Sequence, residues 1–247
     1  MSDFASLVVL SYNRADYIRR SLQSMRANTT CPYQLIVADD GSDEATQGLL
    51  FWGLRRGLIS TLLLNSGHNM GIGLQVNRGM ECARGNILAK LDADLDYKPG
   101  WLETAVGLLQ KHERIGCLGL FKYWHKPCHF DEEKIADRGD HWEVTDFVGS
   151  AVLFRRDVWE LFGPWVDVNR CFAEDVDFKQ RVQRSGHYLA LPKDDLAVNF
   201  GFGEQHSSLI KKIDWKEGHH EYNIPDPMPL LLGQKGEPCQ GIPVGWS

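Results

Sequence analysis

Apolar, strand-like segments alternate with segments of helical spacing through the first 112 residues of the chain. The expected strand–helix pairs occupy 6–10 with 16–26, 34–38 with 43–56, 60–64 with 73–84, and 87–91 with a helix that begins at Pro99. Because each helix returns the chain to the same edge of the sheet, such repeats build a parallel sheet. We therefore predict an α/β fold with a mostly parallel central sheet and helices on both faces.

The second half of the chain follows a different pattern. Further strands are expected over 115–121 and 148–155, and further helices over 157–162 and 173–185. Residues 122–146 are polar, rich in His and aromatic residues and aperiodic, which indicates a long functional loop or a small subdomain. Residues 219–247 hold five prolines and four glycines without a clear period, so we expect an irregular tail there.

Composition narrows the class of protein. With 27 Lys and Arg against 33 Asp and Glu, the formal net charge is −6, which disfavours a generic nucleic-acid binder. The six cysteines are scattered and form no CxxC pair, so we expect them to be reduced thiols rather than disulfides. The first residues enter a strand almost at once and no window approaches about 20 apolar residues, so we expect no signal peptide and no membrane span. These features predict a cytoplasmic protein.

The apolar strand 87–91 leads directly into Asp92 and Asp94. If the extended geometry continues, two carboxylates at i and i+2 point the same way, at the end of the strand where α/β folds bind ligands. Such hard oxygen ligands suit Mg²⁺ or Mn²⁺ carrying a diphosphate. The alternative is a solvated acidic turn that caps the next helix.

Polar residues also follow the first two strands. Ser11–Arg14 comes after the first, and Asp39 and Asp40 end the second. Carboxylates at this edge can accept hydrogen bonds from a base N–H or from ribose hydroxyls. Each segment alone could be an ordinary polar turn, but three strand ends with such groups on one edge favour a nucleotide site.

Gly71-x-Gly73 follows a strand and opens a helix, which raises the possibility of a dinucleotide cofactor. The third glycine of that fingerprint is replaced by Val76, and no acidic residue closes the following strand in the usual ribose position. The sequence therefore disfavours a nicotinamide cofactor.

A zinc site could in principle draw on His125, Cys128, His129 and His141. Their spacing does not form a tidy tetrahedral ligand set, and loop histidines are usually surface residues. Structural zinc is therefore a minor alternative.

Acidic residues open the expected helix near 173, beginning with Glu174 and Asp175. Acids in a first helical turn complement the helix dipole. The functional alternative is that one of them is a general base that faces the metal.

The ordered set of motifs resembles a family-2 glycosyltransferase of the GT-A fold. The matching segments are Ser11–Arg14, Val37–Ser42, Asn69–Gly73, Leu91–Asp94, Val148–Arg156 and Glu174–Asp177, within about residues 6–206. The resemblance implies a Rossmann-like central sheet with an acceptor-side subdomain. In it, 1–112 form the nucleotide-sugar-binding half, 113–218 the acceptor-binding and catalytic-base half of the same domain, and 219–247 an irregular tail.

The resemblance also implies roles for individual residues. Nucleotide-sugar binding would fall to Ser11, Tyr12, Asn13, Arg14, Asp39, Asp40, Asn69, Gly71, Asp92 and Ala93. Asp94, with His206, would ligate Mn²⁺ or Mg²⁺. Asp175 would be the general base that takes the acceptor proton, with Glu174 as the second candidate.

The implied activity is an inverting, metal-dependent transfer of a sugar from a nucleotide-sugar, chiefly a UDP-sugar, to an acceptor hydroxyl. One alternative is a sugar nucleotidyltransferase, although Ser11–Arg14 lacks the glycine usual in that loop. Another is a non-catalytic nucleotide-sugar-binding module. The acceptor is open between a saccharide, a small molecule and a protein. Nucleic acid is a weaker candidate, based on the aromatic and basic residues of 121–126 and 211–216.

Overall fold

The computed structural model describes residues 4–65, 69–122, 135–166 and 174–201. Its first elements alternate as the sequence predicts. They are β1 (Ala5–Ser11), α1 (Ala15–Ala27), β2 (Tyr33–Asp39), α2 (Glu44–Arg55), β3 (Thr61–Leu64), α3 (Ile72–Cys82), β4 (Ile87–Leu91), β5 (Leu95–Tyr97) and α4 (Trp101–Lys111). The second group comprises β6 (Ile115–Gly119), β7 (Ala136–Asp137), β8 (His141–Val144), β9 (Ala151–Arg155), α5 (Arg156–Phe162), α6 (Glu174–Arg184), β10 (Tyr188–Pro192) and β11 (Ala197–Asn199).

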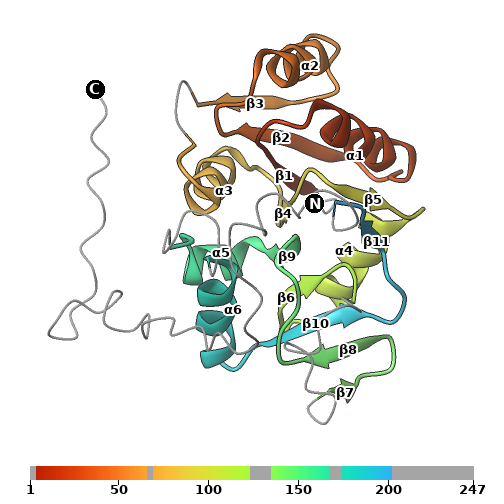
Figure 1. Ribbon diagram of the computed structural model, residues 1–247. Coiled ribbons are helices and arrows are strands. Elements are labelled where there is room, and N and C mark those ends of the chain that lie inside the picture. The colour runs from red at the N-terminus through yellow and green to blue at the C-terminus, as the bar shows by residue number, and fades with distance from the viewer. Residues whose placement is uncertain (1–3, 66–68, 123–134, 167–173, 202–247) are drawn as a thin grey trace, which may run out of the picture. The chain divides into compact units, whose positions relative to one another are not determined.

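A nine-stranded sheet in the order β3-β2-β1-β4-β9-β6-β10-β8-β7 forms the centre (Figure 1). Strands β1 to β4 pair in parallel, as predicted, and β6 pairs in parallel with β10. Strand β9 lies antiparallel between β4 and β6, and so joins the two halves of the sequence in one sheet. Strands β5 and β11 form a separate antiparallel pair.

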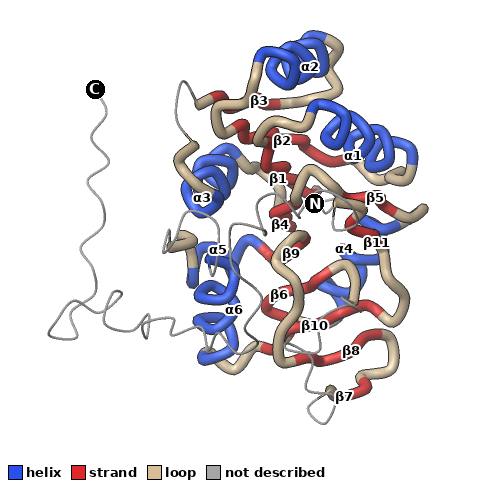
Figure 2. The backbone as a smooth tube through the Cα atoms, viewed as in Figure 1, coloured by secondary structure: helices blue, strands red, loops and turns tan. Residues whose placement is uncertain are grey.

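Helices cover both faces of the sheet (Figure 2). On one face α1, α2 and α4 share an apolar cluster with Leu7 and Val9 of β1, and on the other α3, α5 and α6 share a second cluster with Val8. This split follows from the alternation of side chains along a strand. Each large apolar side chain that is fully buried there, such as Trp101 or Phe178, contributes roughly 1.5–3 kcal/mol to folding.

Among the described residues, five strands were not predicted: β5, β7, β8, β10 and β11. Two of them, β7 and β8, lie inside the segment 122–146 that the sequence indicates to be a loop or subdomain. The short β8 is held by antiparallel pairing with β10 rather than by a period of its own.

Across the stretches that the structure describes, every helix is too short or too polar to span a lipid bilayer.

Candidate functional site

The chain order of the strands marks where a site can form. From β1 the chain proceeds to β2 and β3 on one side, and β4 then pairs on the other side of β1. Ligands in α/β sheets bind at the carboxyl ends of the strands where the order reverses. We call this edge the carboxyl-end rim; it comprises the carboxyl ends of β1, β2 and β4 and the first turn of α6.

The turn after β1 is fixed in an unusual backbone conformation. Asn13 and Arg14 both have left-handed φ angles, 58° and 61°, and a non-glycine residue such as Arg14 adopts this region at a cost of about 1–2 kcal/mol. Hydrogen bonds to the loop after β2 stabilise it: Asn13 N–H donates to Ser42 Oγ at 2.7 Å, and Asp43 N–H donates to Asn13 Oδ1 at 2.8 Å. Tyr12 is half exposed beside them.

The two acids that end β2 differ in their surroundings. Asp39 is fully buried and its carboxylate accepts hydrogen bonds from the backbone N–H and the hydroxyl of Ser42. Ser11, its register partner at the end of β1, is buried as well.

Asp40 is committed to the loop before α3. Its carboxylate accepts from Met70 N–H at 2.8 Å, Gly71 N–H at 2.9 Å and Gln75 Nε2 at 2.8 Å, and from Asn65 Nδ2 at 3.2 Å. Four donors match the acceptor capacity of a carboxylate. Asp40 therefore fixes the loop that carries Gly71 and the adjoining Asn69.

The acidic pair is arranged by a turn. Strand β4 ends at Leu91 and a turn begins at Ala93, so the extended geometry on which a common direction of the two carboxylates depends does not continue. Asp92 is anchored by its backbone N–H, which donates to Ser150 O at 2.8 Å. Ala93 packs against the core, and Asp94 is buried with 8% of its surface exposed.

Asp94 has a small set of polar neighbours. Asn199 Nδ2 donates to its Oδ1 at 3.0 Å, and Arg14 Nη1 lies 3.9 Å from its Oδ2. A Cβ at position 201 would fall 2.1 Å from Oδ2, so only Gly201 fits beside it. Burial, reinforced by the charge of Asp92, raises the pKa of Asp94 to about 6 despite Arg14. A buried carboxylate of this kind favours a cation beside it.

Lys90 is a residue of this candidate site that the sequence analysis missed. It is 2% exposed, and its ammonium group donates to Asp92 Oδ1 at 2.6 Å and to Gly149 O at 2.7 Å. Burial alone would lower the pKa of Lys90, but the charges of Asp92, Glu174 and Asp175 raise it overall. A lysine inside an otherwise apolar buried strand was the available signal.

The first turn of α6 meets this lysine from the other side. Glu174 is 7% exposed, and burial raises its pKa. Asp175 Oδ2 lies 2.9 Å from the buried ammonium of Lys179. A Cβ at position 149 would fall 2.2 Å from that same Oδ2, so Gly149 lies directly against Asp175.

Lys179 fixes this helix to the preceding loop. Its ammonium group donates to Phe147 O at 2.5 Å and pairs with Asp146.

Gly149 contacts both sides of the rim. Its carbonyl accepts a hydrogen bond from Lys90, and its α-carbon lies against Asp175. The strand that carries the acidic pair and the helix that carries the expected base are linked through one glycine.

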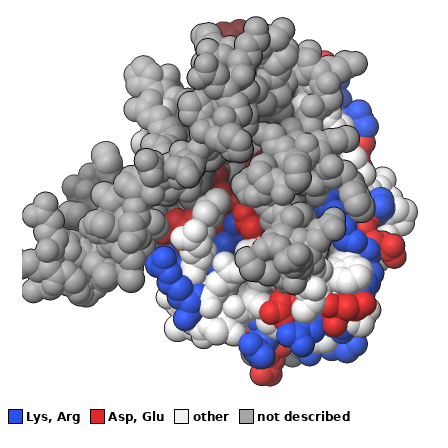
Figure 3. Space-filling view, turned by 60° about the horizontal axis from the view of Figure 1, so that its bottom comes forward, with Lys and Arg blue, Asp and Glu red and all other residues white. Residues whose placement is uncertain are grey.

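The structure therefore brings together most of the residues that the resemblance singled out. His206 lies outside the described residues, as do His125, Cys128 and His129 of the zinc alternative. Asn199 and Gly201, which contact Asp94 from the end of β11, were not predicted. On the face drawn in Figure 3, the described basic and acidic side chains are intermixed, a distribution unlike the basic stripe of nucleic-acid binders.

The chain is similar in sequence to known proteins. The family model for glycosyl transferase family 2 matches residues 6–162. Chondroitin synthase from Escherichia coli is 30% identical over 233 residues, which cover 76% of this chain and 33% of the synthase. The chain spans about a third of the length of the first curated relatives that it matches.

Two solved structures share the fold. The mannosyltransferase PcManGT from Pyrobaculum calidifontis, in complex with GDP-Man and Mn²⁺, has a TM-score of 0.67 at 20% identity and covers 84% of this chain and 60% of its own. The structure of GalNAc-T7 with UDP, GalNAc and Mn²⁺ has a TM-score of 0.62 at 15% identity. The match covers 77% of this chain and 42% of GalNAc-T7. These likenesses confirm the GT-A fold predicted from the sequence.

Proposed function

Because this chain belongs to glycosyl transferase family 2, we propose that it transfers a sugar from a nucleotide-sugar to an acceptor hydroxyl with inversion at the anomeric carbon. The observation that carries the proposal is a chain of contacts at the carboxyl-end rim. It joins Asp92, the neighbour of Asp94 in the acidic pair, to Asp175 through Lys90 and Gly149. A buried carboxylate with a raised pKa lies on one side, and a lysine-paired carboxylate on the other. The family match favours sugar transfer over the nucleotidyltransferase and non-catalytic alternatives.

Asp94 is the residue best suited to hold a divalent metal. Its carboxylate is a hard ligand, it is buried, and its nearest cation, Arg14, stands 3.9 Å away, at the limit of an ion pair. A bound Mn²⁺ or Mg²⁺ would supply positive charge beside the diphosphate that leaves. Both solved neighbours contain Mn²⁺, which supports this choice.

The nucleotide would lie along the ends of β1 and β2. Asp39 would accept a hydrogen bond from the base or the ribose, and Arg14 would face the phosphates. Asp40 would act through the loop that it holds, presenting Asn69 and Gly71. A UDP-sugar is the proposed donor; the two solved neighbours contain GDP-Man and UDP, so the base itself must be tested.

Asp175 is the proposed general base. The acceptor oxygen attacks the anomeric carbon, its proton passes to Asp175, and the bond from that carbon to the phosphate oxygen breaks with the electron pair leaving on the nucleoside diphosphate. The ion pair with Lys179 holds the carboxylate in place for this step. Glu174, whose raised pKa reflects burial, is the second candidate.

Hydrolysis of the donor, with water as acceptor, tests this proposal without knowledge of the natural acceptor. A panel of UDP- and GDP-sugars is incubated with the protein and Mn²⁺, and the anomeric configuration of the released sugar is followed by NMR. We expect release of an inverted sugar that Asp175→Asn abolishes. A sugar released with retained configuration, or an Asp175→Asn variant as active as wild type, contradicts the assignment.

A further inference from the structure

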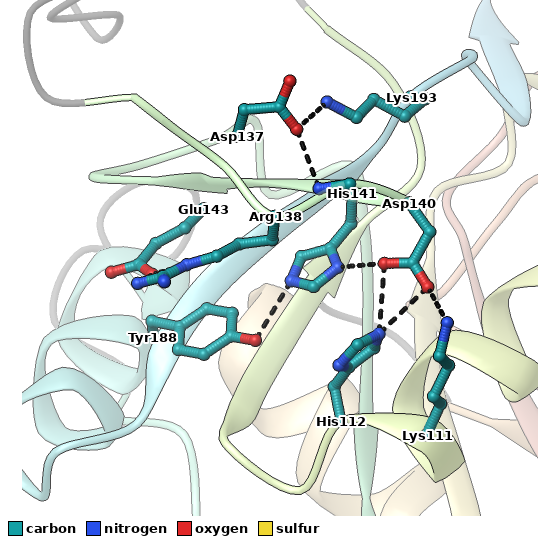
Figure 4. Close-up of polar contacts among 10 residues, drawn as sticks. Lys111, His112, Asp137, Arg138, Asp140, His141, Glu143, Tyr188 and Lys193 are labelled. Carbon is teal, nitrogen blue, oxygen red and sulfur yellow. Dashed lines mark hydrogen bonds and ion pairs between the residues drawn. The ribbon is translucent and has the colours of Figure 1, made fainter.

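Three potential metal ligands meet away from the carboxyl-end rim, where the end of α4 contacts β8 (Figure 4). His112 follows α4 directly, Asp140 lies between β7 and β8, and His141 begins β8. One ligand atom from each lies within 4.8 Å of the other two. Strand β8 is four places from β4 in the sheet order, roughly 19 Å at about 4.8 Å per strand. The cluster is therefore separate from the carboxylates of the rim.

The carboxylate of Asp140 is the centre of the cluster. His141 Nδ1 lies 2.7 Å from its Oδ1, and His112 Nε2 lies 3.0 Å from its Oδ2. Lys111 also donates to the same carboxylate, so three side chains gather around it. An aspartate is ionised at neutral pH, and this is the form that binds a cation.

Tyr188 supports His141 from the far side of its ring. The Tyr188 hydroxyl lies 3.0 Å from His141 Nε2 and can either donate or accept a hydrogen bond. With Nδ1–H donating to Asp140, the hydroxyl donates to Nε2. If Nδ1 uses its lone pair for a metal, Nε2–H donates to the hydroxyl instead. Such a partner for the second ring nitrogen is typical of metal-binding histidines.

We propose that His112, Asp140 and His141 form a second metal site, for Zn²⁺ or a similar first-row transition metal, with water as a fourth ligand. Zinc bonds to His nitrogen and carboxylate oxygen measure about 2.0–2.2 Å. In a tetrahedral site the ligand atoms then stand about 3.3–3.6 Å apart. The present separations of 2.7 and 3.0 Å differ from this by small side-chain movements. Two imidazoles with one carboxylate suit such metals rather than Mg²⁺.

Lys111 is the internal competitor for this site. Its ammonium group lies 2.6 Å from Asp140 Oδ2, and two thirds of its side chain is exposed. A metal ion would therefore displace an exposed surface cation, which can move into solvent. Removal of Lys111 should tighten metal binding, whereas a purely structural role of the cluster would give no such gain.

The site would connect the end of α4 to β8. Because β8 is a short strand near the edge of the sheet, a metal there ties it to the main core. Binding of Zn²⁺ should raise the melting temperature, since a ligand of the folded state stabilises it by mass action. This inference concerns a different part of the chain from the transfer site and does not depend on it.

Titration calorimetry of the metal-stripped 247-residue chain with ZnCl₂ tests the proposal. The sequence has other His and Cys residues, so the comparison is between variants. His112→Gln should remove one equivalent of bound Zn²⁺, and Lys111→Ala should tighten that equivalent. His187→Gln, which replaces a histidine outside the cluster, is the matched control and should bind as wild type does. Tyr188→Phe should weaken binding by about 10- to 100-fold, as loss of such a partner does.

Co²⁺ substitution gives an independent readout. We expect visible bands of tetrahedral Co²⁺ that His112→Gln abolishes and Lys111→Ala preserves. Equal Zn²⁺ stoichiometry and affinity in wild type, His112→Gln and Asp140→Asn, all with native circular dichroism, would overturn the proposal.

Discussion

Replacing Gly149 by alanine tests the connection between the two sides of the rim. The added Cβ would lie 2.2 Å from Asp175 Oδ2, and Cβ atoms essentially never approach closer than 3.0 Å. The carboxylate must therefore shift by about 1 Å, and a displacement of that size from a productive geometry costs about 100-fold in rate. That loss corresponds to about 2.7 kcal/mol of transition-state stabilisation.

The assay is the rate of donor hydrolysis under saturating nucleotide-sugar and Mn²⁺. We expect kcat to fall while the affinity for the nucleoside diphosphate stays close to wild type. The added methyl group contacts the proposed base, Asp175, and not the residues proposed to bind the nucleotide. Gly107→Ala is the matched control: its Cβ meets nothing within 4 Å, and in the interior of α4 it should stabilise the protein by about 0.5–1 kcal/mol. A Gly149→Ala variant with the wild-type kcat would refute the reasoning.

Three further predictions follow from the same contacts. Mn²⁺-dependent nucleotide binding should weaken about tenfold per pH unit below pH 6, measured by calorimetry, because Asp94 must ionise to bind the metal. Since the pKa of Asp94 is raised in the folded state, stability without metal should fall as the pH rises from about 4 to 6. Asp94→Asn should accordingly raise the free energy of unfolding at pH 7 by up to about 3 kcal/mol, measured by urea unfolding. Lys90→Met should lower that free energy by about 1–3 kcal/mol, because the partly exposed Asp92 carboxylate and the Gly149 carbonyl both lose their buried ammonium donor. The exposed-pair variant Lys111→Met should change it by at most about 1 kcal/mol.

The half of the fold in which strands and helices alternate could be predicted, because the spacing of apolar residues within each segment indicates its secondary structure. Residues 5–91 carry apolar runs and helical spacings that each element needs for its own burial, and the structure follows them. Strand β10 with its partner β8 was beyond such reasoning. Residues of β8 read as polar and aperiodic, and they form a strand because Leu189–Pro192 offers them a free edge.

The candidate site shows the same division. The acids at the strand ends could be identified from their positions after apolar runs. The difference between Asp39 and Asp40 could not, because it is set by Met70, Gly71 and Gln75, which are 30 or more residues away in the chain. Lys90 was overlooked because a charge in a buried strand has meaning only once its partners are known.

The turn at Asp92–Asp94 has a similar explanation. If the strand continued, both carboxylates would share a face. The Asp92 N–H still bonds Ser150 in the register of β4 and β9, but the chain turns at Ala93, before Asp94. Asp94 then takes its position from Asn199 and Gly201, which arrive from the far end of the described chain. No local pattern contains that information.

The most direct test of the central claim is calorimetric titration of UDP and GDP into the protein, with and without Mn²⁺. The same titration is run on Asp94→Asn and on Asp96→Asn, a matched change of a carboxylate two residues away that pairs with Arg20 at the surface. Our account predicts metal-dependent binding of a nucleoside diphosphate that Asp94→Asn abolishes and Asp96→Asn leaves intact. Nucleotide binding that is independent of Mn²⁺, or that survives Asp94→Asn unchanged, would contradict it.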